Sequence, residues 1–168
     1  MSYGKHCSEA KDLKARCAVV TLSDTRTRQT DGSGKRIEQL LTEAGHAVPE
    51  YRIIPDEPED LQGVLTELLG LDDLDAVITN GGTGVSKRDR TIEVVQPLLE
   101  ITIPGFGELF RMLSWEQVKS GALLSRAVGG VAKGKLLFAL PGSIAAVELA
   151  VSKLILPEIG HLLFQLRK

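Results

Sequence analysis

The sequence predicts an α/β protein: a three-layer α/β/α sandwich whose sheet is mainly parallel, with an antiparallel hairpin at its edge. Short apolar, β-branched runs alternate with segments of helical periodicity at least three times, which is the pattern of a parallel sheet covered on both faces. Two later apolar runs flank Lys133-Gly134, a typical hairpin turn. The length of 168 residues suits one compact domain and is short for two.

The first half of the chain contains three expected strands and two expected helices. Each strand is a short apolar run, and each helix has apolar residues three and four positions apart and stops at a glycine. Pro58 and its acidic neighbours fit the first turn of the second helix. In order, we expect a strand at 17–23, a helix at 35–45, a strand at 48–54, a helix at 56–70 and a strand at 75–80.

The second half is expected to add a helix, a loop followed by a helix, the hairpin and a helical C-terminus. Proline lacks a backbone N–H and interrupts helices. Pro97 is therefore expected to kink the first of these helices, and Pro157 to divide the C-terminal one into two pieces. The expected ranges are 91–100 for the helix, 104–121 for the loop and next helix, 125–143 for the hairpin and 144–168 for the helical end.

Composition excludes several classes of function. The formal net charge is −2 and aromatic residues make up 4%, which argues against a nucleic-acid binder. No run approaches the roughly 20 apolar residues of a membrane span. We expect residues 1–15 to form a flexible tail without the apolar centre of a signal peptide, and 16–168 to form one cytoplasmic domain. Cys17 is expected to be a buried thiol, with a disulfide to Cys7 as the alternative.

The segment NGGTGVSKRDRT, residues 80–91, lies between an expected strand and an expected helix. Gly81, Gly82 and Gly84 let a ligand approach backbone N–H groups and the start of the helix, and phosphate is the usual ligand of such a turn. The alternative is that the glycines only make a tight turn. Lys87 replaces the third glycine of a dinucleotide-binding motif, so a plain Rossmann dehydrogenase is excluded.

Two aspartates follow strands at the same expected edge of the sheet. Asp89 follows the glycines, and Asp56 follows the strand at 48–54. A carboxylate beside a phosphate site is repelled unless a cation lies between them, and Mg²⁺ binds both kinds of oxygen. The alternatives are that Asp89 pairs with Arg88 or Arg90 and that Asp56 caps the following helix.

Six blocks in register carry a family resemblance that runs from about Arg16 to Leu166. They are TLSDTRTRQTDGSG, IIPDE, NGGTGVSKRDRT, IPGFGELFRMLS, LLSRAVGG and LFALPGS. Together they resemble the MogA/MoaB family of molybdenum-cofactor biosynthesis, and the MoaB branch most closely.

The resemblance implies the family's molybdopterin-binding α/β fold, a homo-oligomer that is a trimer or hexamer, and a molybdopterin adenylyltransferase. Such an enzyme uses ATP and Mg²⁺ to transfer AMP to molybdopterin and releases pyrophosphate. It implies that Asp56 and Asp89 are the catalytic and Mg²⁺-binding residues. The implied substrate and nucleotide residues are Ser23, Asp24, Gly81, Gly82, Thr83, Gly84, Arg88, Glu108, Ser125, Gly142 and Ser143.

The chain departs from the family pattern at Asn80, Arg90, Ile92 and Ile144. The alternative function is a non-catalytic molybdopterin-binding paralogue, a carrier or scaffold in the same pathway. A further alternative is a structural oligomer, because the aromatic residues of 105–115 suit either a subunit contact or the core.

Overall fold

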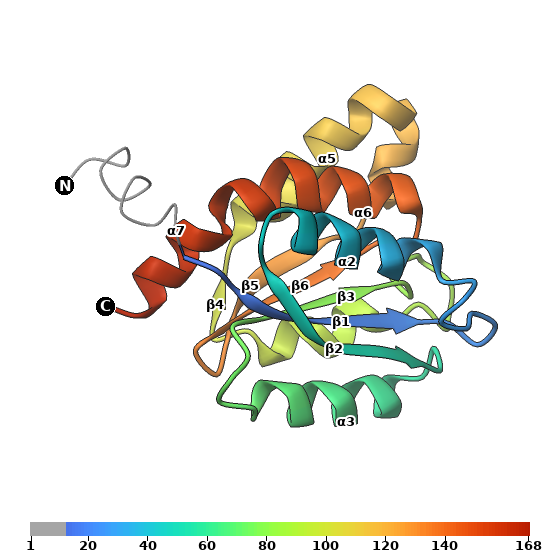
Figure 1. The fold of residues 1–168 in the computed structure, drawn as a ribbon. Coiled ribbons are helices and arrows are strands. Elements are labelled where there is room, and N and C mark those ends of the chain that lie inside the picture. Colours follow the sequence, from blue (N-terminus) through green and yellow to red (C-terminus); the bar gives the residue numbers. More distant parts are fainter. Residues whose placement is uncertain (1–12) are drawn as a thin grey trace.

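The computed structural model describes residues 13–168, and within this range the strands form one six-stranded sheet (Figure 1). The spatial order of the strands is β2-β1-β3-β6-β5-β4. The strands are β1 (Arg16–Leu22), β2 (Ala47–Ile54), β3 (Ala76–Asn80), β4 (Ile101–Thr102), β5 (Val128–Ala132) and β6 (Lys135–Leu140). The helices are α2 (Gly32–Glu43), α3 (Pro58–Leu69), α4 (Thr91–Val95), α5 (Pro104–Val118), α6 (Ile144–Ala150) and α7 (Leu156–Leu166).

Four neighbouring strands, β2, β1, β3 and β6, are parallel, and β5 is antiparallel to both β6 and β4. The hairpin turn lies at Lys133 and Gly134, both with positive φ angles (48° and 72°), as a tight hairpin requires. These features confirm the expected mainly parallel sheet and its antiparallel addition. The carboxyl ends of the four parallel strands lie at the same edge, where ligands collect in open α/β sheets.

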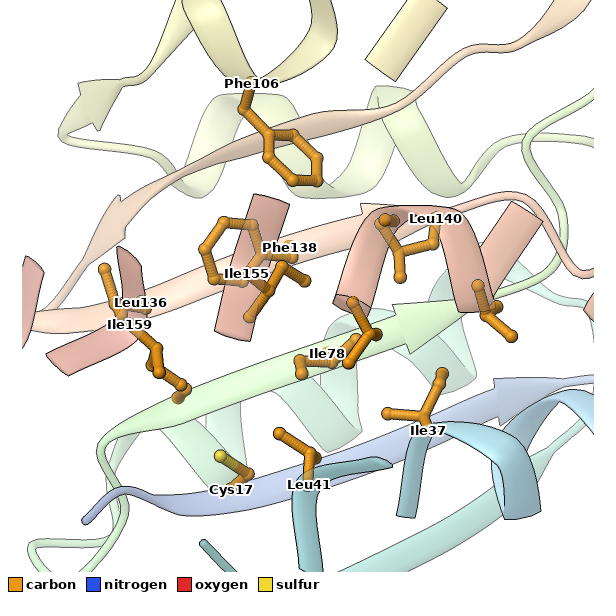
Figure 2. Close-up of a cluster of buried hydrophobic side chains, with 14 of the residues drawn as sticks. Cys17, Ile37, Leu41, Ile78, Phe106, Leu136, Phe138, Leu140, Ile155 and Ile159 are labelled. Carbon is orange, nitrogen blue, oxygen red and sulfur yellow. The ribbon is translucent and has the colours of Figure 1, made fainter. Parts of the chain in front are cut away.

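Each face of the sheet is covered by helices, which confirms the three layers. One apolar cluster joins the sheet to α2, α5, α6 and α7, and a second joins it to α3 and α4. In β1, Cys17 and Val19 belong to the first cluster and Ala18 and Val20 to the second, because successive side chains of a strand point to opposite faces. Figure 2 shows the first cluster, in which Ile37 of α2 and Phe106 of α5 pack against the strands.

Two helix boundaries differ from the expected ones. Helix α2 begins at Gly32, three residues before the expected start, because buried Asp31 accepts a hydrogen bond from the Gly34 amide (3.0 Å). Helix α4 ends at Val95, and a 3₁₀ turn, Gln96–Leu98, carries Pro97. The chain then adds β4, an edge strand of two residues that sequence periodicity does not reveal.

The C-terminal helix is not divided at Pro157, contrary to expectation. Helix α6 continues through a π-helical turn, Val151–Ile155, directly into α7. Pro157 cannot donate a hydrogen bond to the carbonyl four residues earlier. We infer that the wider π turn before Pro157 accommodates the loss of this hydrogen bond, so the helix continues.

Helix α5 divides residues 105–115 between the core and the surface. Phe106 and Phe110 are buried in the core, whereas Leu109, Met112 and Trp115 are exposed. The exposed residues recur three positions apart and so share one face of the helix.

Most of the expected tail, residues 1–12, lies outside the described residues. Within the described part, Ala15 is buried and its amide donates to His46 Nδ1 (3.0 Å), so the packed region begins before residue 16. Cys17 is a free, buried thiol, as expected. Among residues 13–168, no helix has the length and apolar character that a membrane crossing requires.

Candidate functional site

The carboxyl ends of the parallel strands lie at the right-hand end of the sheet in Figure 1. The residues that follow these ends line a polar cleft of about 630 Å³. It collects residues from the loops that follow β1, β2, β3 and β6, together with Leu124. The lining residues are Leu22, Ser23, Asp24, Thr25, Arg26, Asp56, Gly81, Gly82, Thr83, Gly84, Asp89, Leu124, Pro141, Gly142 and Ser143.

Each of the four peptide carbonyls of the glycine loop, residues 81–84, accepts a hydrogen bond from Thr91 or Arg126. The carbonyl of Gly81 accepts from Thr91 Oγ (2.9 Å) and that of Gly82 from the Thr91 amide (3.0 Å). The carbonyl of Thr83 accepts from Arg126 Nε (2.9 Å) and that of Gly84 from Arg126 Nη2 (2.6 Å). Thr91 and Arg126 therefore set the orientation of four consecutive peptide planes.

This orientation determines where the loop amides point. In a trans peptide the C=O and the following N–H point in opposite directions, and the described residues contain no cis peptide. The N–H groups of residues 82 and 83 consequently point away from Thr91, and those of residues 84 and 85 point away from Arg126. Consecutive backbone N–H groups that face one side form an anion-binding concavity.

The glycines are required by space as well as by conformation. Gly81 and Gly82 have φ angles of 101° and 63°, which side chains disfavour. A Cβ atom on Gly82 would lie 2.6 Å from Asp56 Oδ1, and one on Gly84 would lie 2.6 Å from Asp89 Oδ2. Both predicted catalytic carboxylates thus lie directly against the glycine loop.

The Asp89 carboxylate is held by the loop itself. Its Oδ2 accepts from the Ser86 amide (2.9 Å), and hydrogen bonds from Ser86 and Gly84 lower the pKa of this carboxyl. The alternative pairing with Arg88 or Arg90 is not seen among the described residues. Helix α4 also has only five residues, so its dipole adds little, and the loop amides must supply the attraction for an anion.

The Asp56 carboxylate has a different environment. No hydrogen bond to its side chain is present within residues 13–168, and the residue that precedes α3 as its cap is Glu57, so Asp56 does not cap that helix. Burial, followed by the nearby charge of Asp89, raises the pKa of the Asp56 carboxyl. Among residues 13–168, Asp56 is thus an acid that lies near another acid and has no hydrogen-bond donor to its carboxylate.

The two carboxylates fit a magnesium ion that is bound together with phosphate. Within the described chain, no three His, Cys, Asp or Glu side chains form a complete metal site. Mg²⁺ commonly takes one or two protein carboxylates, completes its shell with water and phosphate oxygens, and so does not need a third. The unbonded oxygens of Asp56 are donors of the required type.

Other predicted site residues have structural partners at the cleft. Ser23 Oγ accepts from the Arg26 amide (3.1 Å), and Ser143 Oγ accepts from the Ala146 amide (3.2 Å), so Ser143 caps α6. Asp24 accepts from the Asp56 amide (3.2 Å) and pairs with Arg88 (2.8 Å). Gly142 approaches Gly81 so closely that an added Cβ would lie 3.1 Å from its Cα.

The structure separates three predicted residues from this group. Arg88 does not line the cleft; it lies at the rim, 57% exposed, and also pairs with Glu57 (3.0 Å). Glu108 and Ser125 line a neighbouring cleft of about 460 Å³. Leu123 lines this neighbouring cleft and Leu124 lines the glycine-loop cleft, so the chain at this point separates the two.

Sequence reasoning missed three residues that shape the site: Thr91, Arg26 and Arg126. Arg26 lines the cleft and donates to Ser33 Oγ (2.6 Å) and to the Gly142 carbonyl (3.2 Å). A signal was present, because both arginines lie inside the blocks SDTRT and LLSRAVGG. Each of them, however, also binds backbone carbonyls distant in the sequence, which no motif identifies.

Comparison with known proteins agrees with this geometry. Residues 18–161 match the model of a probable molybdopterin binding domain. The chain is 50% identical over 169 aligned positions to molybdenum cofactor biosynthesis protein B of Bacillus cereus, covering 100% of this chain and 99% of that protein. The corresponding protein of Bacillus subtilis is 47% identical, also with 100% and 99% covered.

Solved structures agree as well. A crystal structure of molybdenum cofactor biosynthesis protein B superposes with a TM-score of 0.90 at 52% identity, over 92% of this chain and 97% of that one. The tungsten cofactor synthesizing protein MoaB of Pyrococcus furiosus gives 0.82 at 34% identity, over 92% and 98%. The chain therefore belongs to the molybdopterin-binding MogA/MoaB family of molybdenum cofactor biosynthesis proteins.

Proposed function

We propose that the protein is a molybdopterin adenylyltransferase that transfers AMP from Mg²⁺-ATP to a phosphate of molybdopterin and releases pyrophosphate. The observation that supports this most directly is the arrangement at the glycine loop. Each of the amides 82–85 points away from the group that binds its peptide carbonyl, the Gly84 amide binds Asp89, and the two carboxylates lie against Gly82 and Gly84. Amides attract the polyphosphate, and carboxylates attract the cation that accompanies it.

The chain's own residues would act mainly by position and charge. Both reactants are anionic, so the protein must align them and offset their repulsion. The amides of Gly82, Thr83 and Val85 would hold nucleotide phosphate, since the Gly84 amide binds Asp89, and Asp56 and Asp89 would hold Mg²⁺. When bound, the ion would supply charge neutralisation and would polarise the bond to the leaving pyrophosphate. No general base is required, because a phosphate nucleophile is already ionised near neutral pH.

The other predicted residues complete the proposal. Ser23, Asp24, Gly142 and Ser143 would shape the walls around the nucleotide. Glu108 and Ser125 would contact the part of molybdopterin that reaches the neighbouring cleft. Arg88 would act from the rim by its charge.

The departures from the family pattern leave the arrangement in place. Asn80 is buried, donates to Thr21 Oγ (2.9 Å) and accepts from Ser33 Oγ (2.7 Å), so it bonds beneath the cleft and does not line it. Arg90 is exposed. Ile92 lines the neighbouring cleft.

The test is molybdopterin-dependent release of pyrophosphate. Purified protein is incubated with ATP, Mg²⁺ and molybdopterin, and with each of the three omitted in turn. We expect pyrophosphate only in the complete mixture. Binding of molybdopterin without pyrophosphate would overturn the proposal and identify a carrier or scaffold.

We also propose that copies of the chain assemble through the exposed face of α5 as a trimer or hexamer, and that the protein acts in the cytoplasm. Leu109, Met112 and Trp115 lie on this face, and Leu123 is 82% exposed nearby in sequence. Sedimentation equilibrium should give three or six times the chain mass, and Trp115→Glu should lower it. A monomeric wild type would contradict the assembly.

A further inference from the structure

We propose that Arg126 is a positioning residue for the glycine loop: it fixes two peptide planes from behind, so that the loop presents its amides to an anion. This inference rests on the proposed function for the phosphate site. It assigns that site's geometry to a side chain outside the cleft, because Arg126 lines the neighbouring cleft instead.

Three carbonyls from two parts of the loop converge on this one guanidinium. Nε donates to the Thr83 carbonyl (2.9 Å), and Nη2 donates to the carbonyls of Gly84 (2.6 Å) and Asp89 (3.1 Å). The first two bonds orient the 83–84 and 84–85 peptides. The third fixes the segment that carries the Asp89 carboxylate, so one side chain sets the relation between the amides and the acid.

The guanidinium is itself held in place on α4. Its Nη1 pairs with Glu93 Oε1 (2.7 Å), and its Nη2 lies 3.4 Å from Oε2. The Arg126 side chain is 28% exposed. A planar guanidinium with five donors in a fixed fork can bind a carboxylate and several carbonyls together, whereas an ammonium is a point charge on a flexible stem.

Thr91 orients the other two peptide planes of the glycine loop. It binds the carbonyls of Gly81 and Gly82, and Arg126 binds the next two. Without Arg126, the Thr83 and Gly84 carbonyls would lose their donors and could turn toward the cleft. A carbonyl that faces an anion repels it, so polyphosphate affinity should fall even though no cleft residue has changed.

The experiment measures binding of inorganic tripolyphosphate with Mg²⁺ by titration calorimetry, alongside the melting temperature. We expect Arg126→Gln and Arg126→Lys each to weaken binding about tenfold or more, since neither can bind the three carbonyls and Glu93 at once. Glu93→Gln keeps the arginine and removes its ionic partner, and is expected to weaken binding about threefold.

The matched control is Arg52→Gln. Arg52 resembles Arg126 in pairing with glutamates, Glu50 (2.8 Å) and Glu67 (3.0 Å), and its side chain is 35% exposed, but it belongs to β2 and does not line the cleft. Its loss should leave tripolyphosphate affinity within about twofold of wild type, as expected for a surface ion pair.

Three outcomes would overturn the inference. They are wild-type protein that does not bind tripolyphosphate, Arg126→Lys that binds it as wild type does, and variants that lose melting temperature but not affinity. The last two would show that the arginine contributes charge or stability without positioning. The result is independent of the pyrophosphate assay: a carrier protein would still show the Arg126 effect, and an active enzyme could lack it.

Discussion

Asp56 and Asp89 approach the same loop from different parts of the chain, and they differ in what holds them. Asp89 belongs to the segment after the glycines and accepts hydrogen bonds from that segment, which lower the pKa of its carboxyl. Asp56 follows β2, receives no hydrogen bond on its carboxylate within the described residues, and has a raised pKa because of burial and the Asp89 charge.

The two acids of the proposed metal site therefore differ in how their charges affect the stability of the fold. The Asp89 charge is stabilised by the fold, so it also orders the loop. The Asp56 charge costs folding free energy, which a bound cation would recover. If both hold Mg²⁺, they should be alike in catalysis and opposite in stability.

The largest expected effect is on turnover. Asp56→Asn and Asp89→Asn should each lower the rate of AMP transfer by about 100-fold or more, because each removes a charge that stabilises the reacting phosphates. Molybdopterin affinity should change by less than about threefold. Steady-state kinetics and fluorescence titration measure the two quantities. Equal losses in affinity and rate would argue against a metal-holding role.

The second effect is a change of melting temperature that differs in sign. Asp89→Asn should melt about 2–4 °C lower at pH 7, as expected for a loss of about 1 kcal/mol from charge-assisted hydrogen bonds. Asp56→Asn should melt slightly higher, because it removes a charge that burial and the neighbouring Asp89 disfavour. Differential scanning calorimetry without Mg²⁺ measures both. Melting-temperature shifts of the same sign would contradict the difference between the two carboxylates.

The third effect is that the melting-temperature differences between wild type and each of the two variants disappear at acidic pH. The lowered pKa of Asp89 contributes stability above the ordinary aspartate pKa, and this is lost as the pH falls through the folded-state value. The raised pKa of Asp56 favours its protonated form, so the wild type equals Asp56→Asn at low pH and falls below it as the pH rises. Melting curves from about pH 3 to 8 test this, and a pH-independent difference would contradict it.

The smallest expected effect concerns Arg88. Its charge lowers the pKa of Asp56, and it is itself exposed at the rim. Arg88→Gln should move the acidic limb of the pH–rate profile upward and change turnover at pH 8 by less than about threefold, since exposed ion pairs contribute little. A loss comparable to that of Asp56→Asn would instead place Arg88 on the phosphates.

Sequence patterns predicted the layers, the parallel strands and the hairpin because these depend on periodicity and turn chemistry within a few residues. The start of α2 and the π turn before Pro157 were not predicted, since each depends on how a particular backbone group is satisfied. The two-residue strand β4 is too short to show any periodicity.

The same limit applies to the site. The strand ends that carry Gly82, Asp56 and Asp89 follow from fold class and motif, so their meeting at one cleft could be expected. The roles of Thr91 and Arg126 could not, because they depend on which side of the loop each carbonyl faces. Placing Glu108 and Ser125 in a neighbouring cleft likewise required the packing of α5.

The proposed transfer of AMP is tested most directly by tracing which phosphate of ATP reaches molybdopterin. Protein, Mg²⁺ and molybdopterin are incubated with ATP labelled at either the α- or the γ-phosphate, and the pterin product is isolated. We predict label on the pterin from the α-phosphate alone, and almost none with Asp56→Asn. Label from the γ-phosphate, or no labelled pterin from the wild type, would contradict it.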